Sequence, residues 1–121
     1  MASYSFDEFV DMLDEIVDTI PDRFCRDLNG GFNALPDTPR DGPRYILGQY
    51  ILRGPLGSMI AIYYGSFAAV LGDQPREVWR KQLTDTVHHE MQHHLGTLAG
   101  HDELARKELR EAMERKRQGL P

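Results

Sequence analysis

Cysteine is nearly absent from this chain of 121 residues, which contains only Cys25. A single cysteine excludes an internal disulfide, and it also excludes the cysteine-rich class of structural zinc site. Any metal ion that this chain binds must therefore be held by histidine and carboxylate side chains.

Long apolar runs are missing as well. No stretch approaches the roughly 18 uninterrupted apolar residues that a membrane-spanning helix needs. Residues 1–13 are acidic and lack the basic start and the apolar run of a secretory signal peptide. We therefore expect a cytoplasmic protein with no membrane partner. With 40% hydrophobic and 27% charged residues, the composition is typical of a globular protein, and we expect one domain over residues 1–121.

The chain also lacks an excess of positive charge, since its formal net charge is −5. Residues 1–41 carry ten acidic and three basic side chains, whereas residues 103–121 carry four acidic and six basic ones. An acidic front half repels phosphate groups, so nucleic acid is not an expected partner. The mixed charges of the tail favour a solvated helix over about residues 103–118.

Apolar residues at helical spacing predict two long helices. The first covers residues 6–20, begins with a capping box of Ser5 and Glu8, and ends before Pro21. A longer helix is expected to start at Pro75 and to run through Leu95 or further. Its buried stripe is expected to consist of Val78, Trp79, Leu83, Val87 and Leu95.

Between these helices the sequence predicts short strands. The strongest covers residues 58–64, where apolar side chains on both faces indicate a strand that is covered on both sides or lines a site. Residues 36–43 are rich in proline and glycine and are expected to form a loop. The remaining elements are strands over 32–35 and 45–52 and helical pieces over 22–28 and 67–71.

All five histidines fall within fourteen residues, and at their centre lies the HExxH motif of residues 89–93. Because residues four apart share a helix face, His89 and His93 can reach one metal ion. Glu90 is turned by about 100° around the helix axis, where its carboxylate can take a proton from a metal-activated water. The motif therefore predicts one Zn²⁺ per chain, with Glu90 as the general base. The alternative is a surface helix whose histidines are only solvated.

A catalytic zinc usually has three protein ligands and one open position. The third ligand must follow the helix break near Gly96 and Gly100, where His101, Asp102 and Glu103 are all candidates that periodicity cannot separate.

The two other histidines of the cluster, His88 and His94, point to other faces of the helix and are not expected on the metal. We expect His94 to pack against the core or to form a hydrogen bond, and His88 to be exposed.

The chain resembles the small minimal zincin metallopeptidases of bacteria. The resemblance rests on Ile60-Ala61-Ile62-Tyr63-Tyr64-Gly65-Ser66-Phe67, Leu71-Gly72-Asp73, Trp79, the run from Thr86 to Leu95, and Leu98-Ala99-Gly100. It implies a compact α+β fold with a small mixed sheet, an N-terminal helix, and the HExxH helix packed beneath the sheet. It also implies zinc on His89 and His93, Glu90 as catalytic base, and a peptide lying along the sheet edge formed by the strand 58–65 or its neighbour.

Many members of that family continue the motif as HExxHxxGxxD, with the final acid as third ligand. Here Gly96 fits the pattern, but the third residue after it is Ala99. The next acids are Asp102 and Glu103, so we expect Asp102 as the third ligand, ahead of His101 and then Glu103.

The leading hypothesis is a zinc-dependent metallopeptidase that acts on a peptide or protein substrate. The alternative is a catalytically silent zincin-fold module that binds a protein partner through the tail helix or the loop 36–43. Glu90 argues against that alternative, because a purely structural metal would not need it. A protease associated with a toxin or antitoxin is a third possibility that nothing in the sequence supports. Tyr63, Tyr64 and Arg44 are conceivable oxyanion donors, although each is expected to be structural or solvated.

Overall fold

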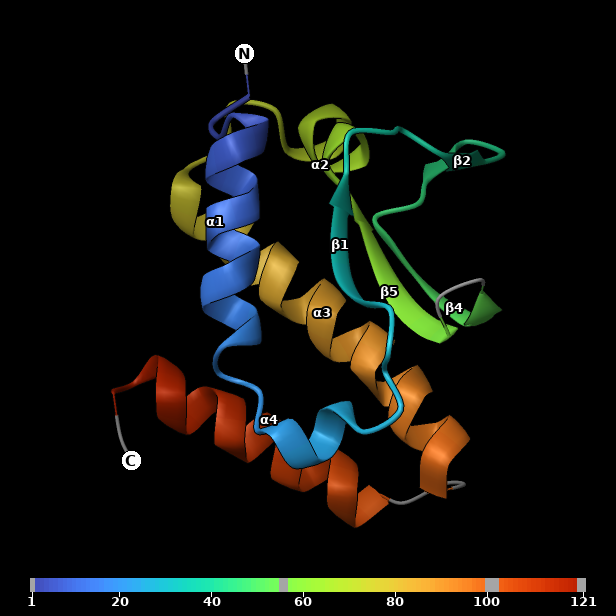
Figure 1. Ribbon diagram of the computed structural model, residues 1–121. Coiled ribbons are helices and arrows are strands. Elements are labelled where there is room, and N and C mark those ends of the chain that lie inside the picture. Colours follow the sequence, from blue (N-terminus) through green and yellow to red (C-terminus); the bar gives the residue numbers. More distant parts are fainter. Residues whose placement is uncertain (1, 55–56, 100–102, 120–121) are drawn as a thin grey trace.

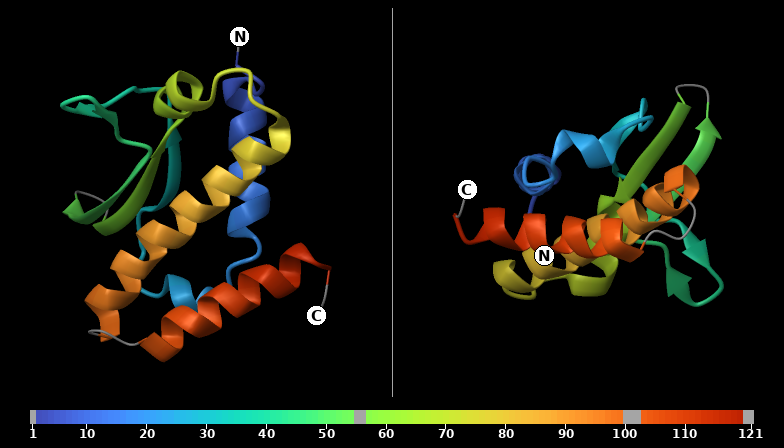
Figure 2. Two further views of the ribbon diagram at one scale, coloured as in Figure 1. Left: turned by 180° about the vertical axis from the view of Figure 1, so that it is seen from behind. Right: turned by 90° about the horizontal axis from the view of Figure 1, so that it is seen from below.

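The computed structural model describes residues 2–54, 57–99 and 103–119 (Figure 1). Helix α1 (Phe6–Val17) stands beside a three-stranded sheet, and the long helix α3 (Arg76–Ala99) crosses behind both. Helix α4 (Glu103–Arg117) runs past the end of α1, as the view from behind also shows (Figure 2). The architecture is the compact α+β fold that the resemblance implied, with the HExxH helix packed against the sheet.

The sheet is mixed and has the order β1-β5-β4. Strand β5 (Gly57–Tyr63) is central, and it pairs in parallel with β1 (Gly31–Leu35) and antiparallel with β4 (Gly48–Gly54). The four residues from Ile60 to Tyr63 are all buried, which confirms the expectation of a strand covered on both faces. Because β5 is paired on both sides, it offers no edge to a substrate, and that half of the sequence-based expectation was wrong.

The observed strands differ from the prediction of a loop over residues 36–43 and a strand over residues 45–52. Residues 36–43 include β2 (Arg40–Asp41), which pairs antiparallel with β3 (Arg44–Tyr45) across a turn where Gly42 has a φ of 62°. The strand expected over 45–52 is broken between β3 and β4, where the carbonyl of Leu47 accepts a hydrogen bond from the backbone N–H of Tyr63. Strands of two residues are too short to show an alternation of apolar and polar side chains, so the sequence could not predict the β2–β3 pair.

Helix α1 begins as predicted and ends early. Both hydrogen bonds of the Ser5–Glu8 capping box are present. Beyond Val17 the chain tightens, because the backbone N–H and the hydroxyl of Thr19 both donate to the carbonyl of Ile16. A single 3₁₀ turn, Asp22–Cys25, replaces the longer helical piece expected over 22–28.

Helix α2 (Tyr64–Leu71) follows β5 directly, three residues before the expected start. Gly65 permits this junction because the chain of residues 36–38 passes close to it. A Cβ at this position would lie 2.0 Å from the hydroxyl of Thr38 and 2.6 Å from the carbonyl oxygens of Pro36 and Asp37. The lack of a side chain at Gly65 therefore allows residues 36–38 to pack against the start of α2.

The core gathers where α1, α2, α3 and the sheet meet, around the fully buried Trp79. Val78 was predicted to be buried but is 38% exposed, whereas Met91 and His94, outside the predicted stripe, are buried. Helix α3 contacts α1, α2, α4, β4 and β5, so its buried residues spread around the helix instead of forming one stripe.

Helix α4 packs on the bundle through Leu109 and Met113, which are both buried. The tail is thus a docked helix with one apolar side, which corrects the expectation that it would simply be solvated. Within the described residues, no helix combines the length and the apolar character needed to span a membrane.

Candidate active site

The face of α3 that carries Thr86, Glu90 and His94 lies against β4. A Cβ on Gly48 would stand 2.7 Å from the methyl group of Thr86, and Tyr50 reaches His94 through its hydroxyl. Glu90 lies one turn from each of these contacts, so helix periodicity places it on the same face. The face of the HExxH helix that carries Glu90 is therefore the one that packs against β4.

Replacing Gly48 with alanine is expected to destabilise the fold by about 1–3 kcal/mol, because the added methyl group collides with Thr86 and forces β4 away from α3. Urea unfolding measures the loss. Leu52→Ala, a change at a half-exposed side chain of the same strand, is the control and should alter stability far less. Equal stability of Gly48→Ala and wild type would contradict the close approach.

His94 joins three elements of the fold and is only 1% exposed. Its Nε2 lies 2.7 Å from the carbonyl oxygen of Arg26, and its Nδ1 lies 2.8 Å from the hydroxyl of Tyr50. A carbonyl can only accept, so Nε2 donates its proton there and Nδ1 accepts the proton of Tyr50. The expectation that His94 packs in the core and forms hydrogen bonds is confirmed, and both ring nitrogens are thereby engaged away from a metal site.

His89 and His93 are exposed one turn apart on the neighbouring face of α3. Their Nε2 atoms are 3.3 Å apart, and the two rings stand nearly perpendicular with centroids 4.9 Å apart. The two imidazoles therefore direct the same nitrogen toward one point at the helix surface.

Glu90 lies between these histidines in sequence but is buried, since only 7% of its surface is exposed. The single buried side-chain polar atom without a hydrogen-bond partner in the described residues belongs to His88 and not to Glu90. The Glu90 carboxylate is therefore largely shielded from solvent, whereas the neighbouring His89 is exposed.

The third predicted ligand cannot be placed. Asp102 and His101 lie outside the described residues, and so does the side chain of Glu103. Among the described side chains, no group of three His, Cys, Asp or Glu residues comes together in a way that could hold a metal ion.

His88 was expected to be exposed and is instead half-buried, with a buried Nε2. Burial lowers its pKa, the nearby positive charge of Arg110 lowers it further, and Asp85 opposes the shift. The expectation failed because α4 covers this side of α3, a long-range contact that helix periodicity does not report.

The two tyrosines considered as oxyanion donors are engaged elsewhere. The hydroxyl of Tyr63 donates to Oε1 of Gln49 at 3.0 Å, and that of Tyr64 donates to the carbonyl oxygen of Tyr4. Burial, with a smaller contribution from Asp37, raises the pKa of Tyr63. Both side chains therefore have structural partners, and Arg44 is exposed on β3.

Comparison with known proteins gives a family match and similar solved structures. The family model of zincin-like metallopeptidases matches residues 26–111. A solved structure, a conserved hypothetical protein from Thermus thermophilus, is 34% identical in sequence and superimposes with a TM-score of 0.70. The match covers 81% of this chain and 100% of that chain. No curated protein matches the sequence. The family match includes β1, the whole sheet and the HExxH segment of α3.

Proposed function

Because this chain belongs to the zincin-like metallopeptidase family, we propose that it is a zinc-dependent hydrolase of peptide bonds whose site is built on His89, Glu90 and His93. The observation that carries the proposal is the pair of Nε2 atoms on His89 and His93, which are 3.3 Å apart. Two nitrogens bound to one tetrahedral zinc at about 2.0–2.1 Å are separated by about 3.3 Å. The exposed imidazole pair thus has the spacing that two zinc ligands need.

Glu90 is proposed as the general base. Bound zinc would supply Lewis-acid chemistry, which lowers the pKa of water and polarises a carbonyl oxygen. Glu90 would accept the proton that the attacking water loses and would pass it to the departing amine. Its burial supports this role, because a carboxylate that is only 7% exposed meets little competition from bulk water.

The third ligand is proposed to be Asp102, with His101 and Glu103 as the alternatives in that order. All three residues adjoin the link between α3 and α4. The hard carboxylate oxygen of Asp102 would complete a His₂-carboxylate set of the kind found in many catalytic zinc sites.

The substrate backbone is proposed to add to the free edge of β4. Strand β4 pairs only with β5 in the three-stranded sheet, and it lies against the Glu90 face of α3. An extended peptide gains affinity by pairing its main chain with such an edge, while the pockets for its side chains set specificity. An extended peptide on this edge would pass close to Glu90.

The experiment that tests the proposal is elemental analysis of the purified protein, after zinc loading and dialysis. Wild type is expected to retain about one zinc per chain. Loss of a group that supports a metal ligand typically lowers the affinity for zinc about 10–100-fold. Because His93→Ala removes a ligand itself, its affinity for zinc is expected to fall by more than that.

His88→Phe is the matched control, since it removes a histidine from the adjacent face of the same helix. It should retain zinc. If wild type holds no zinc, the hydrolase proposal fails and the silent partner-binding module becomes the better hypothesis. If His88→Phe loses zinc as His93→Ala does, the assignment of ligands is wrong.

A further inference from the structure

A cavity lies between α1, α3 and α4, on a side of α3 that is away from Glu90. Its volume is about 430 Å³, within the range of small-molecule sites. Helix α3 contributes Arg80, Thr84, Asp85 and His88 to its lining. His88 is two residues before Glu90, which turns it by about 200° around the helix, so this cavity is separate from the HExxH site.

Basic side chains outnumber acidic ones by one in the lining of this cavity. Four lining residues are basic and three are acidic, not counting His88: Arg80, Arg110, Lys116 and Arg117 against Glu15, Asp85 and Glu114. The cavity therefore has a surplus of about one positive charge, which suits a monoanion.

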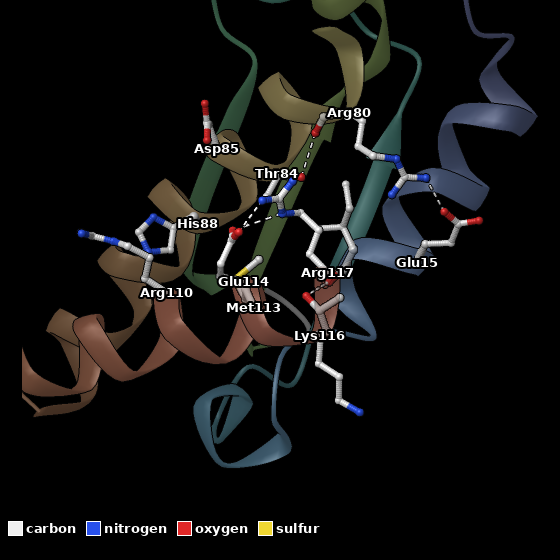
Figure 3. Close-up of a pocket in the computed structure, with 12 residues that line it drawn as sticks. Glu15, Arg80, Thr84, Asp85, His88, Arg110, Met113, Glu114, Lys116 and Arg117 are labelled. Carbon is white, nitrogen blue, oxygen red and sulfur yellow. Dashed lines mark hydrogen bonds and ion pairs between the residues drawn. The ribbon is translucent and has the colours of Figure 1, made fainter. Parts of the chain in front are cut away.

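Two of the arginines are already held in place. Arg80 pairs with Glu15, and Arg117 pairs with Glu114 through both Nε, at 3.1 Å, and Nη2. Figure 3 shows both ion pairs beside the space between the helices. Because a guanidinium carries five N–H donors, each arginine keeps donors for a further acceptor.

His88 provides a donor that lacks an acceptor. Its Nδ1 faces the side-chain nitrogen of Gln92 at 3.4 Å. An amide nitrogen only donates, so Nδ1 accepts and the proton of the neutral ring lies on Nε2. That Nε2 is buried and has no hydrogen-bond partner among the described residues, a condition that folded proteins rarely leave unsatisfied.

The uncharged part of the lining consists of two threonines, Thr19 and Thr84, and two apolar side chains. Ile16 of α1 and Met113 of α4 contribute to the cavity and are otherwise buried, at 4% and 6% exposure. A ligand with a short apolar body would gain contact with these side chains while its charged end reaches the donors.

We propose that this cavity is a binding site for a small organic monocarboxylate with a short aliphatic body. The carboxylate accepts hydrogen bonds from Nε2 of His88 and from the unused N–H groups of Arg117, and the aliphatic part lies on Ile16 and Met113. A carboxylate has the two acceptor oxygens and the single charge that these donors and the surplus of one positive charge require.

The test is titration of the full chain with N-acetyl-L-leucine, followed by ¹H–¹⁵N NMR. Saturable shifts are expected at Thr84, His88 and Met113, with a Kd on the order of 1 mM for a ligand of this size. N-acetyl-L-leucinamide, which lacks the charge, should bind about tenfold more weakly or not at all. Inorganic phosphate should also bind more weakly, since it carries more charge and no apolar body.

Arg117→Ala and His88→Phe are each expected to weaken binding about tenfold, the effect of losing one charge-assisted hydrogen bond. Arg115→Ala is the matched control, because it also removes one arginine from α4 but Arg115 does not line this cavity. Equal binding of acid and amide, tighter binding of phosphate, shifts that do not saturate, or equal weakening by Arg115→Ala would each overturn the proposal. The NMR spectrum of each variant reports whether it is folded.

Discussion

Glu90→Gln is expected to abolish peptide hydrolysis while the protein still holds one zinc per chain. Glutamine has nearly the same shape as glutamate, so the packing against β4 is preserved. Its amide cannot accept a proton from water, and a general base typically contributes about 10²–10⁴-fold to the rate. The measurement is kcat/KM on a mixture of short peptides, with the zinc content of the same samples determined in parallel.

Glu77→Gln is the matched control for this variant. Glu77 is exposed in the first turn of the same helix, so the substitution makes the same change in net charge away from the site. Full activity in Glu77→Gln and none in Glu90→Gln would assign the proton transfer to Glu90. Hydrolysis that survives in zinc-loaded Glu90→Gln would refute the role of Glu90, whatever the metal content.

The parts of the fold that the sequence predicted well are those that depend on local patterns. The capping box at Ser5 and Glu8 depends on residues three apart, and the strand of Ile60–Tyr63 is apolar on both faces. The HExxH helix also follows from local composition. In each of these segments the signal lies within a few residues, which is the range over which sequence patterns determine structure.

The parts that the sequence did not predict depend on contacts between distant segments. Val78 was expected in the core, yet it is exposed because the helices and strands around α3 leave that side open. His88 was expected to be exposed, yet α4 covers it. Both errors have the same origin, because periodicity gives the angle of a residue around its helix but not which neighbours surround that helix.

The same reasoning applies to the candidate site. Local spacing is enough to bring His89 and His93 together, since both lie on one helix one turn apart. The proposal that a peptide adds to the edge of β4 needed the strand order, because the sequence left the strand 58–65 and its neighbour equally open. The proposed third ligand, Asp102, lies outside the described residues, and no helical spacing in the sequence relates it to His89 and His93.

Trp79→Ala is expected to cost about 3–5 kcal/mol, the usual range for removing a fully buried large aromatic side chain. Its ring contacts those of Tyr4, Phe9, Tyr64 and Phe67, with centroid distances from 5.5 to 6.2 Å. Its Nε1 also donates to the carbonyl oxygen of Gly72 at 3.2 Å. Since typical domains are stable by only about 5–15 kcal/mol, the variant should unfold at much lower urea concentration.

Val78→Ala is the control that isolates the role of burial, because Val78 is the neighbouring residue of the same helix turn and is 38% exposed. It should change stability by less than about 0.5 kcal/mol. Trp79 anchors the start of α3 to α1 and α2, ten residues before His89, so its loss removes the support of the HExxH segment without touching that segment. If zinc binds only the folded chain, saturating zinc should restore about 2.7 kcal/mol at a concentration of 100 Kd. Restoration in Trp79→Ala but not in a double variant with His93→Ala would show that zinc stabilises the folded chain by binding through His93, whereas equal restoration in both would show that zinc acts elsewhere.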